Sequence, residues 1–203
     1  MFKLLITISF VFLTCYTFAE GKVVEAPFGL KWGITKEALG DAGIIFSECS
    51  DEGWVEQCRT ESVPKNISMG DFYLLLFTKK YGLQKAVMLG KDISGDPNGS
   101  SGKDKYAKLK QALKNKYEKS VSYEWVGREL WGESDEFYQC LDYEGCGSWT
   151  TYWTENHEGS IALELKGVNR GEGYIRLSYE GKLWSSAIDE KDEIQEASDF
   201  DAL

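Results

Sequence analysis

Histidine, the side chain most often used for acid–base and metal chemistry, occurs once in this sequence. His157 lies in a polar run from Glu155 to Gly159, which is typical of a hairpin tip. A nucleophile activated by histidine would have to be built around this residue, and histidines on loops are more often simply solvated. We therefore expect no catalytic residue of this type and no histidine-rich metal site.

Acidic side chains crowd near aromatic ones in the second half of the chain. The acids are Glu129, Glu133, Asp135, Glu136, Asp142 and Glu144. A sugar-cleaving site needs two carboxylates about 5 to 10 Å apart, a separation that sequence does not define. Because the chain holds 33 acidic residues, some crowding is expected. Surface acids are the preferred interpretation, and a carboxylate-based glycan hydrolase is the alternative.

An oxygen-rich loop from Asp92 to Gly99 has some features of a calcium site. Acidic and amide side chains alternate along it, but Pro97 stands at the glycine position of an EF-hand and Lys103 at the position of the bidentate acid. A turn-rich connection explains the segment better. We expect neither a metal nor a cofactor.

Aromatic side chains supply the candidate binding surface. The second half contains Trp125, Trp131, Tyr138, Tyr143, Trp149, Tyr152 and Trp153. Those that share a face with Ile161 or Leu163 should be core, and an exposed remainder would bind a protein or stack on sugars. The candidate binding residues are Trp131, Trp149, Tyr152 and Trp153.

Four cysteines follow residue 19, at positions 49, 58, 140 and 146. They allow three connectivities, and the short spacings across turn-rich segments favour Cys49–Cys58 and Cys140–Cys146, each closing a hairpin. A four-cysteine zinc site usually places two residues between paired ligands, a spacing that neither pair has. The disulfides indicate an oxidising compartment.

The first 19 residues have the pattern of a secretory signal. Lys3 precedes an apolar run from Leu4 to Leu13, and small-residue cleavage is expected after Ala19. A membrane anchor is the competing interpretation, but the apolar run is short for a bilayer. Acylation at Cys15 is a further alternative, although Thr14 is not the usual residue before a lipidated cysteine. We expect a periplasmic or secreted protein without a membrane span.

Net charge narrows the class of partner. The chain carries −10 at pH 7, or −11 once Lys3 is removed with the signal. Because phosphate binding requires the opposite sign, we expect no nucleic-acid partner. Seven acids opposed only by Lys191 give residues 185–203 a charge of −6, a pattern typical of a solvated, disordered tail. A basic protein or a divalent cation stays compatible with it.

Periodicity predicts two helices and a series of short strands. Thr35 should cap a short helix that ends at Gly40 or Gly43. Residues 103–118 show the clearest helical spacing, with Ser101 and Asp104 as a weakened capping box. The expected strands are residues 44–49, 54–60, 71–79, 83–89, 120–126, 137–141, 148–154, 160–166 and 173–180.

This order predicts an α+β fold of antiparallel sheet with helices packed on one face. After the signal peptide at 1–19, we expect a helix-plus-sheet unit at 20–91, a linker loop at 92–102, a second unit at 103–184 and the acidic tail at 185–203. The two units should lie side by side. The sequence does not define whether their sheets are continuous, nor the oligomeric state.

The run from Phe28 to Ala38, which begins Phe-Gly-Leu-Lys-Trp-Gly, resembles the start of several small exported bacterial proteins. The layout is also similar to the β-lactamase inhibitor protein and to the small lipoprotein of the barrel-assembly machinery. These resemblances imply a class, that of non-enzymatic binding proteins, and transfer no site. The leading hypothesis is an exported inhibitor, immunity or envelope-accessory protein that binds another envelope protein. A glycan-binding module is the alternative.

Overall fold

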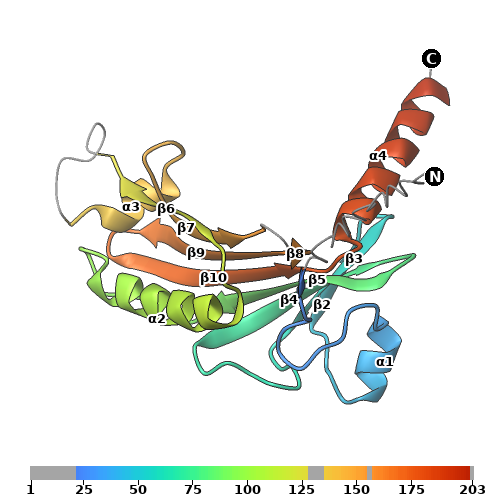
Figure 1. The fold of residues 1–203 in the computed structure, drawn as a ribbon, viewed down its shortest axis with the longest axis horizontal. Helices are drawn as coiled ribbons and strands as arrows, with labels where there is room; N and C mark the ends of the chain where they lie inside the picture. The colour runs from blue at the N-terminus through green and yellow to red at the C-terminus, as the bar shows by residue number, and fades with distance from the viewer. Residues whose placement is uncertain (1–21, 128–134, 155–156, 202–203) are drawn as a thin grey trace, which may run out of the picture.

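The computed structural model describes residues 22–127, 135–154 and 157–201, which form an eight-stranded antiparallel sheet and four helices (Figure 1). In spatial order the strands are β2 (Glu48–Asp51), β3 (Val55–Thr60), β4 (Gly70–Thr78), β5 (Gly82–Gly90), β10 (Glu172–Glu180), β9 (Ser160–Asn169), β7 (Gly147–Trp153) and β6 (Val121–Val126). β1 (Lys22–Val23) and β8 (His157–Glu158) form a short parallel pair. The predicted α+β class is confirmed.

The two halves of the chain meet in the middle of this sheet. β5 from the first half pairs with β10 from the second, with Met88 opposite Leu177 and Ala86 opposite Tyr179. The two predicted units therefore share one continuous sheet.

Alternate residues of the central strands build the core on one side of the sheet, which we call the inner face. Tyr73, Met88, Leu177 and Leu163 stand in register across four adjacent strands and are each at most 2% exposed. Burying a side chain of this size contributes about 1.5–3 kcal/mol. Because side chains alternate along a strand, the same pattern turns every second residue to the opposite, outer face.

Three helices contribute to this one core. They are α1 (Lys36–Asp41), α2 (Ser100–Lys116) and α3 (Phe137–Asp142), through Leu39, Tyr106, Leu113 and Tyr138 among others. Figure 1 shows α1 and α2 on the same side of the sheet, as predicted.

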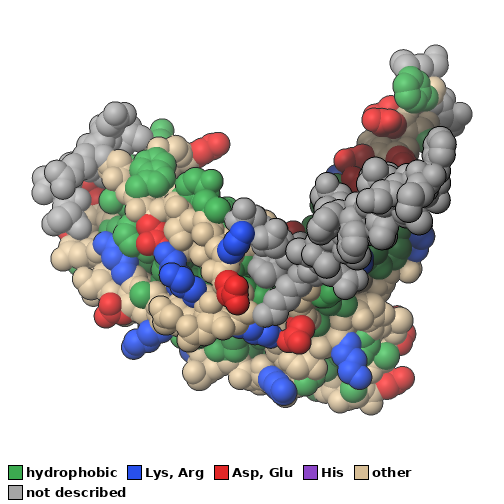
Figure 2. Space-filling model, viewed as in Figure 1, with side chains coloured by type: hydrophobic (Ala, Val, Ile, Leu, Met, Phe, Trp, Pro, Cys, Tyr) green, Lys and Arg blue, Asp and Glu red, His purple; other side chains and the backbone are tan. Residues whose placement is uncertain are grey.

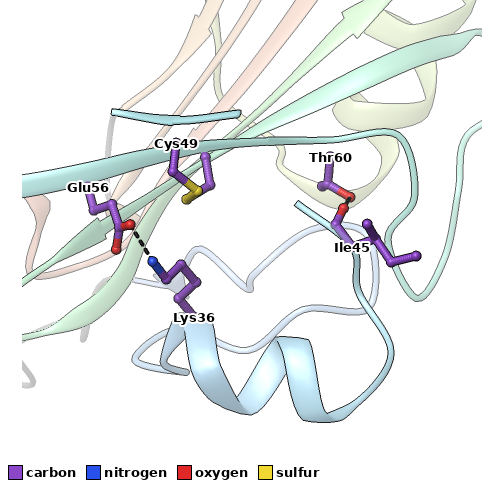
Figure 3. Close-up of a disulfide and its surroundings, with 6 residues drawn as sticks. Lys36, Ile45, Cys49, Glu56 and Thr60 are labelled. Atoms are coloured by element: carbon purple, nitrogen blue, oxygen red, sulfur yellow. Dashed lines mark hydrogen bonds and ion pairs between the residues drawn. A yellow bond between two sulfur atoms is a disulfide. The ribbon is translucent and has the colours of Figure 1, made fainter. Parts of the chain in front are cut away.

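α1 begins where the sequence indicates. The Thr35 hydroxyl accepts a hydrogen bond from the Ala38 amide at 3.2 Å, which is the usual role of an N-cap threonine. Lys36 in the first turn forms an ion pair with Glu56 of β3, close to the first disulfide (Figure 3). The helix is thereby tied to the first half of the sheet.

α2 begins at Ser100, three residues earlier than predicted, and its cap is a different residue. Asp96 is 9% exposed, and its carboxylate accepts hydrogen bonds from the Gly102 amide at 2.9 Å and the Tyr138 hydroxyl at 2.8 Å. Burial alone would raise the pKa of Asp96, but these donors together hold it below its usual value. The capping box expected from Ser101 and Asp104 is wrong, because a residue from the preceding loop serves instead.

α3 replaces the strand expected at residues 137–141. Phe137, Tyr138, Cys140 and Leu141 are all buried, whereas a strand on a one-sided sheet would bury alternate residues. Gly173 leaves the space that the Tyr138 ring fills, since a Cβ there would overlap it. The helix thus closes one end of the inner face.

The acidic tail is also helical, so the expectation of a disordered end is wrong for its described part. α4 (Trp184–Asp201) meets the body at its first turns, where Trp184 packs on Trp54 with ring centroids 5.5 Å apart. Glu190 pairs with Lys80 and accepts a hydrogen bond from the Tyr81 hydroxyl at 2.5 Å. Beyond these contacts the helix projects from the body (Figure 1). None of the described helices is both long and apolar enough to cross a membrane.

Both predicted disulfides are confirmed. Cys49 and Cys58 are directly opposed in the β2–β3 hairpin, with Cα atoms 4.1 Å apart. Cys140 and Cys146, with Cα atoms 5.0 Å apart, link α3 to the loop before β7. The second disulfide therefore joins a helix to the loop that follows it and does not close a hairpin.

Candidate functional site

Four large apolar side chains stand together on the outer face at the β6–β7 end of the sheet. Val121, Tyr123 and Trp125 of β6 are 47%, 53% and 48% exposed, and Tyr152 of β7 is 38% exposed. Val121 pairs directly with Tyr152, and the rings of Tyr123 and Tyr152 make an edge-on contact at 6.2 Å. We call these four residues the aromatic patch.

The strand geometry of β6 fixes this display. The residues between the patch members point to the inner face, where Ser122 lies 2.9 Å from the Thr151 hydroxyl and Glu124 pairs with Lys110 of α2 at 2.5 Å. These inward contacts tie β6 to β7 and to α2. The odd-numbered residues of β6 are consequently turned outward as a group.

A charged pair adjoins the patch. Glu164 of β9 and Arg176 of β10 form an ion pair at 3.1 Å on the outer face. Burial raises the pKa of the Tyr152 hydroxyl, and the nearby Glu164 carboxylate raises it further. Tyr152 therefore stays a neutral hydroxyl, able to donate and accept hydrogen bonds, well above physiological pH.

The outer face continues beyond the patch into the first half of the sheet. Phe72, Leu74 and Leu76 of β4 are half-buried there, and the Arg59 guanidinium lies over the Phe72 ring at 4.0 Å. Figure 2 shows hydrophobic side chains gathered at the β6–β7 end and a hollow between that end and the projecting α4. The described residues of the outer face thus form a mixed apolar and charged surface.

The four predicted binding residues do not lie together on one surface. Tyr152 lies in the aromatic patch, but Trp153 is fully buried in the inner core and cannot contact a partner. Trp149 is half-buried on the inner face, where its ring centroid lies 5.4 Å from that of Phe137. Trp131 lies outside the described residues.

Tyr123 and Trp125 are exposed residues of the aromatic patch that the sequence analysis did not name as candidate binding residues. The signal was present in the alternation Val121-Ser122-Tyr123-Glu124-Trp125, since period two places the three large residues on one face. The same rule separates Tyr152 from Trp149 and Trp153. The alternation did not show which of the two faces the helices would cover.

The other chemical candidates do not assemble into a reacting site among the described residues. Asp135 forms an ion pair with Arg170, while Asp142 and Glu144 are exposed. Glu136 immediately precedes α3, and Glu129 and Glu133 lie outside the described residues. The backbone of His157 belongs to β8 and pairs with Lys22.

One possible set of metal ligands occurs among the described residues, namely Cys49, Glu56 and Cys58. Both sulfur atoms are joined in a disulfide, so they are not the thiolates that bind a metal. Glu56 is already paired with Lys36 (Figure 3). The cluster therefore stabilises the hairpin and its contact with α1.

A cavity of about 520 Å³ lies between α1 and the β4–β5 turn. Its wall contains Lys36 with Glu56, and Lys79 with Asp51 at 3.8 Å. Because these charges oppose one another within the wall, the cavity offers a bound ion little net attraction.

No family model matches the chain, and the searches found neither a similar curated protein nor a similar solved structure.

Proposed function

We propose that this chain is an exported, non-enzymatic binding protein that holds a protein partner against the aromatic patch on the outer face of its sheet. The observation that carries the proposal is the joint exposure of Val121, Tyr123, Trp125 and Tyr152 on one sheet face while α1, α2 and α3 pack on the other. Large aromatic residues gathered on an exposed face are typical of interaction sites.

The chemistry of the patch suits a protein partner. Rings with polar tips supply contact area and hydrogen bonds at low cost in conformational entropy. The Glu164–Arg176 pair beside the rings offers both signs of charge at the rim. Such a pair orients a partner more than it adds affinity.

Export is supported by two independent features. Residues 1–19 have the pattern of a secretory signal, and two disulfides join all four later cysteines. Disulfides persist in oxidising compartments. A periplasmic or secreted location is therefore part of the proposal.

Glycan binding is the second candidate, because Tyr123 and Trp125 expose rings beside charged and hydroxyl groups. Rings of this kind also stack on sugars. The two candidates differ in the chemical nature of the bound molecule, which one experiment identifies.

The test is affinity capture from envelope extract, followed by identification of the bound molecules and measurement of their dissociation constants. Replacing Tyr123, Trp125 or Tyr152 by Ala should weaken protein binding by about 2 kcal/mol each, the scale of an aromatic hot spot. Phe200→Ala is the matched control, since this ring on α4 is 75% exposed and lies outside the patch. Thermal melting of every variant separates lost binding from lost folding.

If the wild type captures a polysaccharide that the patch variants fail to bind, the ligand of the patch is a glycan and not a protein. If Glu136→Ala or His157→Ala abolishes activity in a folded protein while the patch variants keep theirs, the binding proposal is wrong. That result would favour the carboxylate-based hydrolase.

A further inference from the structure

Among the described strands, β2 and β6 form the two edges of the sheet, and these edges are built differently. β2 at one edge has four residues, of which Glu48 and Asp51 are acidic and Cys49 is fixed to β3 by a disulfide. Short length and charged side chains are the usual means by which proteins prevent a free edge from pairing with another chain. The β2 edge has these protective features.

β6 at the other edge has fewer of these features, because it is longer and carries a single charged side chain. Its six residues are all exposed, pair with β7 in unbroken register and contain neither proline nor lysine. The one charged residue, Glu124, is paired with Lys110. Within the part of the chain that the structure describes, this regular and largely apolar edge of six residues has no neighbouring strand beyond it, so its outer backbone groups can pair with a further strand.

We propose that β6 pairs antiparallel with β6 of a second copy of this chain, about a two-fold axis at Tyr123. The two sheets then become one continuous sheet. In this register Val121 faces Trp125 of the second copy, and Ser122 faces its Glu124. Apolar residues meet apolar ones on the outer face, and no like charges oppose one another.

The neighbouring symmetric registers are less favourable. Directly opposed residues must share a face, so the axis moves by whole residues along the strand. An axis at Glu124 would oppose two carboxylates, and an axis at Ser122 would pair only residues 121–123 within the strand. Tyr123 is the centre that combines long pairing with compatible side chains.

Electrostatics gives the association a distinctive salt dependence. Each copy carries a net charge of −10, so long-range repulsion opposes the dimer. The Debye length falls from about 10 Å at 0.1 M salt to about 3 Å at 1 M. Added salt should therefore strengthen this dimer, because the pairing itself is formed by backbone and apolar contacts.

The test is sedimentation equilibrium of the purified protein from micromolar to millimolar concentration, at low and high salt. A monomer–dimer equilibrium that tightens with salt is expected. Ser122→Glu would oppose two carboxylates at each symmetric pair and should raise the dissociation constant about threefold to tenfold, whereas Ser122→Lys should lower it by a similar factor. Ser122 is outside the aromatic patch, so these variants do not test the proposed partner site.

The proposal requires that the two substitutions shift the dissociation constant of the dimer in opposite directions. This requirement is needed because Ser122 also lies against the Thr151 hydroxyl. Loss of that contact affects both variants alike, and thermal melting measures it. A monomer under all conditions overturns the proposal and leaves β6 as an edge for the strand of a different protein. A dimer that neither substitution affects, or that both shift in the same direction, overturns it as well.

Discussion

At the scale of single residues, side-chain direction decides what each aromatic residue does. Tyr152 and Trp153 are adjacent in β7, yet one is 38% exposed in the patch and the other is fully buried. Their difference follows from the alternation of a strand and not from residue type. The same rule turns Tyr123 outward and leaves Glu124 to pair with Lys110 of α2.

Asp96 is the residue whose loss should affect folding most specifically. Asp96→Ala removes the acceptor for the Gly102 amide and the Tyr138 hydroxyl, so we expect a loss of about 2–3 kcal/mol in the free energy of unfolding, measured by urea denaturation at pH 7. The matched control is Asp104→Ala, the residue of the expected capping box, which is exposed and should change stability by less than about 0.5 kcal/mol.

The difference in stability between the wild type and Asp96→Ala should depend on pH in a defined direction. The pKa of Asp96 is lowered in the folded state, so its contribution is complete above the unfolded value of about 3.9 and is lost as pH falls through the folded pKa. The difference between the wild type and Asp96→Ala should therefore shrink below about pH 4. A difference that grows in acid would contradict the lowered pKa.

At the scale of elements, tertiary contacts override local pattern at α3 and α4. The segment 137–141 is rich in residues that favour strands, but its nearly continuous burial against Gly173 and the second disulfide requires a helix. α4 contains many like charges, yet Trp184 anchors its start on Trp54 and Lys85. A buried aromatic anchor supplies what a charged segment lacks by itself.

Truncation should separate the anchored and free parts of α4. Deleting residues 192–203 should leave the melting temperature nearly unchanged, because the described side chains from Asp192 onward are exposed. Trp184→Ala should instead lower the free energy of unfolding by about 3 kcal/mol, the low end for removing a buried tryptophan. Equal effects of the two changes, measured by thermal and urea unfolding, would show that the far part of the helix also docks.

At the scale of the whole molecule, the β5–β10 pair makes one structural unit of two similar halves. Met88 and Leu177 at this junction are at most 2% exposed and belong to the same core as residues from α1 and α2. A shared core across a continuous sheet is expected to couple the halves energetically. The predicted side-by-side units are thus parts of one core.

Unfolding should accordingly be a single transition. Leu75→Ala in β4, a fully buried position, should remove about 2–5 kcal/mol and shift the melting of both halves together. Scanning calorimetry and tryptophan fluorescence should agree on one midpoint. Val168→Ala, at an exposed position of β9, is the control that should leave it in place. Two separate transitions would show that the halves fold independently.

The sequence by itself determined the class of fold, both disulfides, the Thr35 cap and most strands of the sheet, because these depend on local periodicity, turn residues and short spacings. Among the described candidate binding residues, Tyr152 is the one that is exposed. Alternation separates two faces of a strand but does not say which face a distant helix covers.

The tertiary structure decided which face of each strand is covered. The packing of α1, α2 and α3 on one side decided that Trp153 is core and that Tyr123 and Trp125 are exposed. Contacts distant in sequence likewise decided the Asp96 cap, the helical form of residues 137–142 and the anchoring of α4. The physical reason is that burial and hydrogen bonding between remote segments outweigh the small free-energy differences of local propensity.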